Sequence, residues 1–221
     1  MYSADILAKL SRVADTDSCA MIMRHAARYP IVDIHHSLEV GLTDRGMNDA
    51  YRLGSTLNSF PNVRLFYSPA LRCKQTAECI MRGLEGNGVS VSITGPELNL
   101  CAPYIKDESC LTAAAQAGKE FIRKWFDGKI SSDWILDTAS AAHMVITPVI
   151  KRLMEPSAER RLDIHISHDW EVSLLREELL NLRYEDVGWP PYLDSVLFQA
   201  DSTDVRVIYG SHEAPLKLTI K

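Results

Sequence analysis

The sequence lacks the cysteine patterns of disulfide frameworks and zinc sites. Its 221 residues include five cysteines, an odd number, with no CxxC pair and no Cys/His cluster at zinc spacing. A chain of this length can bury a sizeable core without covalent staples. We therefore expect free thiols in a reducing cytoplasm. No carboxylate cluster suggests a metal site, and we expect no cofactor.

Long apolar runs and an excess of positive charge are also missing. No run approaches the length of a membrane span, and residues 1–18 lack the apolar stretch of a signal peptide. The net charge of −5 argues against a nucleic-acid binder, whose footprint should be basic. We expect a soluble cytoplasmic protein without membrane or nucleic-acid partners, in which any basic site is built locally from a few arginines.

The order of expected elements predicts the fold class. Short apolar runs at 19–23, 63–67, 89–93 and 160–167 read as strands, and helical patterns follow most of them. β-rich runs at 195–200, 205–210 and 216–220 predict a terminal antiparallel meander. We expect a single α/β domain over 1–221, a three-layer α/β/α sandwich whose central sheet is mostly parallel with an antiparallel edge. A small helical and irregular cap insertion should span about 95–158, and the β-rich C-terminus offers an edge for a homodimer.

The first candidate site stands where the first strand ends. The apolar run MIM stops at Arg24 and His25, and Arg28 follows three residues later. Guanidinium groups are always charged and bind phosphate as a rigid fork. An imidazole between two such cations is costly unless an anion binds there. The alternative interpretation is a capped strand end with surface charges.

Two further strand-to-helix junctions carry similar residues. Ser68-Pro69 caps the next expected helix and places Arg72 in its first turn, and His168-Asp169 opens a later helix. In open α/β sheets, ligands bind beyond the carboxyl ends of strands, and helix N-termini favour anions. If the strands are neighbours, the arginines and histidines converge on one anion site. His35 and His36, in the loop after the first motif, are candidates for its mouth.

These side chains could transfer a phosphoryl group through a covalent intermediate. A neutral nitrogen of His25 would attack phosphorus while Arg24, Arg28, Arg72 and His168 hold the equatorial oxygens. Asp169 stands beside His168 and could protonate the leaving alkoxide. The arginines supply the positive charge, so the chemistry requires no metal.

The segments RHAARYP, LTDRGMNDAYRLG, YSPALRCKQTAE and ISHDWEV resemble, in this order, the motifs of the histidine phosphatase superfamily (phosphoglycerate mutase-like). The Arg-x-Pro ending and the His-Asp pair resemble the histidine acid phosphatase branch more than the mutase branch. The resemblance implies that His25 is the phosphate-accepting nucleophile and Asp169 the proton donor, with Arg24, Arg28, Arg72 and His168 as the phosphate pocket. In the mutase branch a glutamate from elsewhere is the donor, so Glu97 and Glu108 remain rivals here.

The chain departs from this family pattern in two places. Ala26 stands where the family usually has glycine, which we expect to narrow the approach to the phosphate or shift the loop. The short insertion should leave an open pocket. The function that follows is a metal-independent phosphatase hydrolysing small-molecule phosphomonoesters. The alternatives are a phosphomutase and a non-catalytic phosphate-binding or protein-binding module on the same fold.

Overall fold

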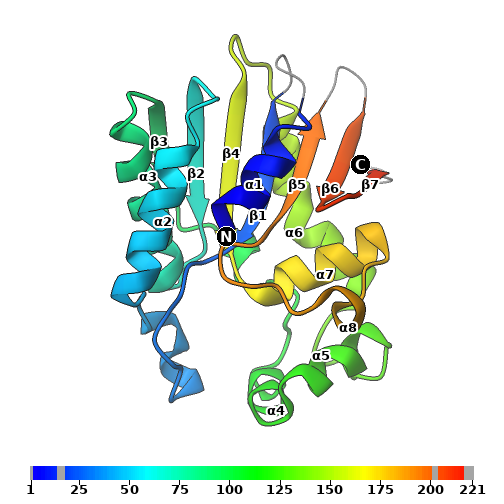
Figure 1. Ribbon diagram of the computed structural model, residues 1–221. Coiled ribbons are helices and arrows are strands. Elements are labelled where there is room, and N and C mark those ends of the chain that lie inside the picture. Colours follow the sequence, from blue (N-terminus) through cyan, green and yellow to red (C-terminus); the bar gives the residue numbers. More distant parts are fainter. Residues whose placement is uncertain (1, 14–17, 201–203, 217–221) are drawn as a thin grey trace.

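A seven-stranded sheet forms the centre of the molecule (Figure 1). The computed structural model describes residues 2–13, 18–200 and 204–216. The strands follow the spatial order β3-β2-β4-β1-β5-β6-β7. Their bounds are β1 Cys19–Arg24, β2 Asn62–Tyr67, β3 Ser90–Thr94, β4 Arg161–Ser167, β5 Ser195–Ala200, β6 Val205–Tyr209 and β7 His212–Pro215.

The sheet is parallel on one side and antiparallel on the other. Strands β3, β2, β4 and β1 pair in parallel, whereas β1 with β5, β5 with β6 and β6 with β7 pair antiparallel. The α/β sandwich is confirmed, but the expectation of a mostly parallel sheet is only partly right. Short connections after β5 force its successors to pair antiparallel, because parallel pairing needs a long crossover. Of the expected last strand, residues 217–220 lie outside the described residues.

Helices cover both faces of the sheet. The clusters of buried side chains place α1, α2 and α3 on one face, and α6 and α7 on the other. The helices are α1 Tyr2–Leu10, α2 Asp44–Thr56, α3 Leu71–Glu85, α4 Ser109–Ala117, α5 Lys119–Phe126, α6 Thr138–Leu153, α7 Asp169–Leu180 and α8 Tyr184–Val187, with 3₁₀ helices η1 Ile34–Glu39 and η2 Leu98–Leu100.

Strand β1 shows why the core has two halves. Successive side chains of a strand point to opposite faces. Met21 and Met23 therefore pack with the α1–α3 face, while Ala20 and Ile22 pack with α6 and α7. The whole strand is buried, as expected for a central strand covered by helices on both sides.

Two helix starts differ in how they are capped. The sequence predicts Thr43 as a helix N-cap, and its hydroxyl accepts a hydrogen bond from the Gly46 N–H at the start of α2, at 3.1 Å. The predicted cap at Ser68 is wrong. Helix α3 begins at Leu71 after Ala70, without a side-chain cap, and Ser68 is left for another role.

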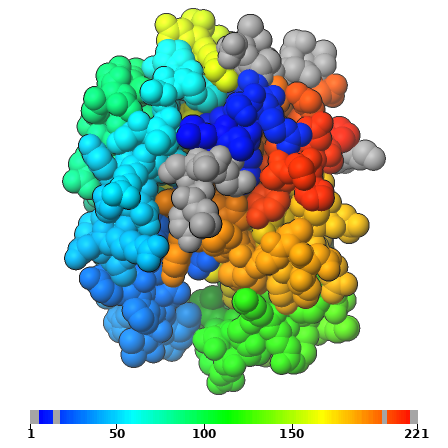
Figure 2. Space-filling model, viewed as in Figure 1, coloured from blue at the N-terminus to red at the C-terminus, as the bar shows by residue number. Residues whose placement is uncertain are grey.

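The segment after β3 contains η2, α4, α5 and α6. The sequence predicts one helix over 111–127, but the structure has two, divided at Gly118, whose φ of +55° favours glycine. The sequence also predicts an interruption near Pro148, and this prediction is wrong because α6 continues through that residue. Helix α6 packs on β1 and α7, whereas α4 contacts η1. A hollow lined by residues of both α4 and η1 opens between these two segments. Figure 2 shows this hollow between the blue and green segments.

Candidate active site

The three predicted junctions meet at one edge of the sheet. Strand β4 lies between β1 and β2 and is parallel to both. Arg24 at the end of β1 is opposite Ser167 at the end of β4, and Tyr67 at the end of β2 is opposite Ile166. The residues that follow each strand therefore share one location. This convergence is the central prediction from the sequence, and the topology produces it.

A cavity of about 540 Å³ opens at these strand ends. Its lining includes residues of η1 and of α4, two segments that lie at the lower end of the molecule in Figure 1. It is lined by His25, Arg28, Ile31, Ile34, His35, Ser37, Leu38, Arg72, Cys101, Ala102, Ile105, Glu108, Leu111, Thr112, His168, Asp169, Trp170 and Glu171. Every junction thus contributes to the lining.

His25 is held in one tautomer. Its Nδ1 lies 2.7 Å from the carbonyl oxygen of Ala26, which can only accept, so Nδ1 carries the proton. In the neutral ring the lone pair is then on Nε2. The side chain is only 2% exposed, and its ring centroid lies 5.6 Å from that of His168. A buried imidazole with a committed Nδ1–H and a basic Nε2 is suited to nucleophilic attack.

Burial and positive neighbours keep both histidines neutral. Burial lowers the pKa of His25 well below its ordinary value, and His168, Arg72 and Arg24 lower it further. The Ala26 carbonyl acts in the opposite direction. The pKa of His168 is likewise lowered well below its ordinary value, first by burial and then by Arg72. His25 is therefore unprotonated near neutral pH in the anion-free site.

His168 is positioned by two side chains. Its Nδ1 accepts a hydrogen bond from Nη2 of Arg72 at 3.1 Å, because a guanidinium only donates. The proton of the neutral ring is therefore on Nε2, which lies 2.9 Å from Oγ of Ser68. Ser68, expected to cap a helix, is instead fully buried beneath this imidazole. The backbone carbonyl of Ser37 in η1 accepts from Nη1 of Arg72.

Arg24 is fixed by the segment after α8. Its Nη1 donates to the carbonyl of Pro190 at 2.6 Å, and its Nη2 lies 2.8 Å from Oδ2 of Asp169. The guanidinium also lies 4.2 Å from the ring centroid of Tyr192. The local sequence around Arg24 does not predict these contacts, because all three partners lie far away in the chain.

Arg24 and Arg72 each have a buried N–H group that makes no hydrogen bond to a described residue. The Nε atoms of Arg24 and Arg72 are buried and have no hydrogen-bond partner within the described ranges. Burying an unpaired donor is costly, so such atoms need an explanation. An anion between the strand ends would supply acceptors for donors of this kind.

Arg28 and Ala26 behave differently from the rest of the first motif. Arg28 lines the cavity but is half-exposed, and its Nη1 donates to the carbonyl of Tyr29 at 2.8 Å. Ala26 is fully buried in the core cluster on the α1–α3 face and is not part of the cavity lining. Its N–H donates to Oγ1 of Thr76. The methyl group therefore fills the core and does not narrow the approach to the anion site.

The carboxylates considered as proton donors occupy different places. Asp169 lines the cavity, and its Oδ2 also accepts from the indole N–H of Trp189 at 3.1 Å. Glu108 lines the cavity on the α4 side. Glu97 is outside the lining and forms an ion pair with Arg152 at 2.7 Å. Of the two rival glutamates, only Glu108 lies at the cavity.

Comparison with known families gives a match to the first two junctions. Residues 21–96, which include His25, Arg28 and Arg72, match the model of the histidine phosphatase superfamily (branch 1). Residues 21–96 are therefore similar to the histidine phosphatase superfamily. The predicted closeness to the acid phosphatase branch stays a prediction.

Solved structures share the histidine phosphatase fold over most of this chain. A mycobacterial glucosyl-3-phosphoglycerate phosphatase has a TM-score of 0.59 at 16% identity, covering 88% of this chain and 99% of its own. A phosphoglycerate mutase from Bacillus anthracis has a TM-score of 0.53 at 14% identity, covering 92% and 93%. No curated protein matches the sequence.

Sequence reasoning missed a buried carboxyl group at the cavity. Glu171 in the first turn of α7 lines the cavity and is 0% exposed. Its Oε1 accepts from the Ala102 N–H at 2.8 Å and from the Tyr104 hydroxyl at 3.3 Å. Burial raises its pKa to about 7. The only local signal was its position two residues after Asp169.

Of the two histidines expected at the cavity mouth, His35 and His36, only the first lines the cavity. His35 lines the cavity, whereas His36 is outside the lining and lies 3.3 Å from Glu39. No group of three or more His, Cys, Asp or Glu residues within the described ranges could hold a metal ion. No helix of residues 2–13, 18–200 or 204–216 is long and apolar enough to cross a membrane.

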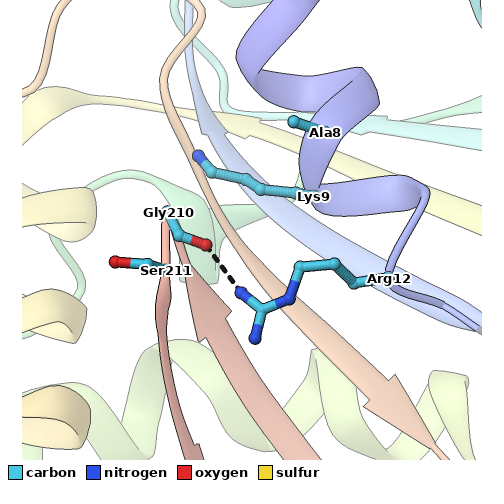
Figure 3. Close-up of a pocket in the computed structure, with 5 residues that line it drawn as sticks. All are labelled: Ala8, Lys9, Arg12, Gly210 and Ser211. Atoms are coloured by element: carbon cyan, nitrogen blue, oxygen red, sulfur yellow. Dashed lines mark hydrogen bonds between the residues drawn. The ribbon is translucent and has the colours of Figure 1, made fainter.

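A second hollow lies away from the strand ends (Figure 3). It has a volume of about 380 Å³ and lies between α1 and the β6–β7 turn. Its lining consists of Ala8, Lys9, Arg12, Gly210 and Ser211. Arg12 donates to the Gly210 carbonyl at 2.7 Å, and Lys9 points between the two segments and donates to the Ser195 carbonyl. These contacts join α1 to the antiparallel half of the sheet.

Proposed function

We propose that the protein hydrolyses phosphomonoesters without a metal, through a phosphohistidine intermediate on His25. The observation that carries this proposal is the buried imidazole of His25, whose Nδ1–H is committed to the Ala26 carbonyl while Nε2 keeps its lone pair. The buried Nε donors of Arg24 and Arg72, which have no hydrogen-bond partner among the described residues, support the binding of an anion. The match of residues 21–96 to the histidine phosphatase superfamily supports this choice of chemistry.

In the first step, Nε2 of His25 attacks phosphorus and the bond to the ester oxygen breaks. Arg24, Arg28, Arg72 and His168 bind the equatorial oxygens, where negative charge is spread in the transition state. Arg72 leaves Nδ1 of His168 to bind the anion. The neutral ring then changes tautomer, so that Nδ1–H donates to the anion and Nε2 accepts from the Ser68 hydroxyl. Asp169 gives its proton to the leaving oxygen, because an alkoxide is a poor leaving group.

In the second step, water attacks the phosphohistidine. The Asp169 carboxylate removes the proton from the water, the N–P bond breaks, and its electron pair returns to Nε2 of His25. Inorganic phosphate leaves, and Asp169 is again protonated. Because Nδ1 stays bonded to the Ala26 carbonyl throughout, the intermediate carries phosphorus on Nε2 only.

Turnover of p-nitrophenyl phosphate over a broad pH range tests the proposal. We expect activity in the unchanged protein, its loss in His25→Ala, and an acid-labile phosphoryl label on the unchanged protein alone. His36→Ala is the matched control, because His36 lies outside the cavity lining. Activity in His25→Ala, or none in the unchanged protein, would overturn the proposal.

The mutase alternative is separated by the fate of the phosphoryl group. A mutase would return it to the substrate and give an isomerised ester without free phosphate. We expect one phosphate released for each ester consumed. The solved neighbours named as a phosphatase and a mutase share the fold alone at these identities, so only this measurement distinguishes the two.

A further inference from the structure

The cavity has a polar inner end and an apolar outer wall. His25, Arg72 and His168 lie at the inner end, next to the strand ends. The outer wall carries six large apolar side chains. From the two sides of the cavity these are Ile31, Ile34, Leu38, Ile105, Leu111 and Trp170.

The outer wall offers no lysine or arginine for a second anionic group. Arg28 and Arg72 are the only Lys or Arg residues of the cavity lining, and both are assigned to the phosphate in the proposed mechanism. Glu108, in contrast, lies on this wall beside Leu111 and Thr112. A carboxylate on the leaving group would therefore lose water without gaining a lysine or arginine partner, and would face the like charge of Glu108.

We propose that the substrate is a phosphomonoester with an apolar, uncharged leaving group, an aryl or alkyl phosphate. This inference rests on the proposed phosphatase function and specifies its substrate class. The phosphate binds at the strand ends, and the leaving group lies between the η1 side and the α4 side of the cavity. Each buried methylene should raise kcat/KM roughly 4-fold, the factor that corresponds to its transfer out of water.

Three aryl phosphates that differ only at their remote end test this inference. They are phenyl phosphate, 4-butylphenyl phosphate and 4-(2-carboxyethyl)phenyl phosphate. The alkyl spacers insulate the phenol, so its acidity changes little and the chemical step is matched. We expect kcat/KM for the butyl ester to exceed that for the phenyl ester by roughly 10-fold or more, and the carboxyethyl ester to fall below the phenyl ester.

Variants of the outer wall locate the effect. Leu38 and Leu111 are 46% and 36% exposed, so replacing them by serine leaves the core intact. Leu38→Ser and Leu111→Ser should each reduce the ratio of kcat/KM for the butyl ester to kcat/KM for the phenyl ester several-fold, because the longer leaving group buries more of this wall. Leu111→Met should retain the preference. Leu98→Ser is the control, because Leu98 is exposed but lies outside the cavity lining.

The outcomes separate this inference from the proposed function. If the protein hydrolyses all three esters but prefers the carboxyethyl ester or shows no preference, the substrate class is wrong and the phosphatase stands. An unchanged preference in Leu38→Ser and Leu111→Ser would also overturn it. If none of the esters is hydrolysed, and p-nitrophenyl phosphate is not hydrolysed either, the proposed function itself fails.

Discussion

One carboxylate oxygen of Asp169 contacts both Arg24 and Trp189. Its Oδ2 is 2.8 Å from Nη2 of Arg24 and accepts from the indole of Trp189. An asparagine at this position keeps an acceptor for both donors and removes the titratable proton. The substitution therefore separates the proton transfer from the positioning of Arg24.

Asp169→Asn should slow hydrolysis of alkyl phosphates by roughly 10²–10⁴-fold, the usual contribution of general acid catalysis. Hydrolysis of p-nitrophenyl phosphate should fall less, because p-nitrophenolate leaves without a proton. The measurement is kcat for both ester types. Equal losses would contradict Asp169 as the acid. If Glu108→Gln shows the leaving-group dependence instead, the donor is Glu108.

Glu171 makes stability depend on pH. Its pKa is about 7 in the folded protein and near 4.5 in the unfolded chain. Below both pKa values the carboxyl is protonated in the folded and the unfolded state, so its ionisation does not reduce the free energy of unfolding. As pH rises through this window the unfolded state ionises first, so stability falls, by about 3 kcal/mol once both states are ionised.

Glu171→Gln should remove this dependence while keeping the acceptor for Ala102 and Tyr104. The variant should gain stability relative to the unchanged protein as pH rises from about 5 to about 8. Urea unfolding at both pH values measures the difference. Glu108→Gln, an exposed glutamate, is the control. A gain that is the same at both pH values would disprove the account.

Helices α2 and α3 touch backbone to backbone. A Cβ atom added to Gly54 would lie 2.1 Å from the carbonyl oxygen of Ile80, and one added to Gly83 would lie 2.3 Å from that of Tyr51. This close packing holds α3, which carries Arg72 in its first turn, against α2. Glycine here serves the approach of two helices and not a turn.

Gly54→Ala should destabilise the fold by about 1–3 kcal/mol or more, since the helices must separate to accept a methyl group against backbone. The better helix propensity of alanine offsets only about 1 kcal/mol. Gly86→Ala is the matched control at the end of α3, where the nearest atom is 3.5 Å from the added Cβ. Urea midpoints measure both. Equal effects of the two substitutions would show that helix contact is not the cause.

The elements themselves were predictable where the signal is local. The threonine cap of α2 and the apolar runs of β1, β2 and β4 are found where the sequence placed them. The interruption at Pro148 was wrong, because α6 is buried against the sheet and packing maintains a helix that the local sequence would break. Ser68 failed as a cap because a distant imidazole binds it.

At the scale of the molecule, the order of the central strands decides whether a site exists. Periodicity identifies the strands but not which strands are neighbours. The sequence therefore predicts one shared anion site only if the three strands lie side by side. The parallel pairing of β4 with β1 and β2 meets that condition. Tyr192, Pro190 and Glu171 could not be foreseen, since their contacts depend on segments distant in the chain. The sequence analysis also expected too small an antiparallel part of the sheet, because periodicity does not show which strands pair.

An anion bound between three strand ends should stabilise the whole fold. Inorganic phosphate at 100 times its dissociation constant would add about 2.7 kcal/mol to the free energy of unfolding. Thermal unfolding in phosphate and in sodium chloride of equal ionic strength measures the gain. Arg72→Ala should abolish most of it, while Arg45→Ala, an exposed arginine outside the cavity lining, should keep it. A gain retained in Arg72→Ala would place the phosphate elsewhere.

The hydrogen bond from Trp189 to Asp169 has an optical consequence. Trp170 lines the same cavity, and its ring centroid is 6.3 Å from that of Trp125. Indole emission responds to nearby charge and to solvent. A phosphoryl group that reaches Arg24 alters the charge beside Asp169 and Trp189, so intrinsic fluorescence can follow the filling and emptying of the cavity in real time. The protein thus contains its own reporter of turnover.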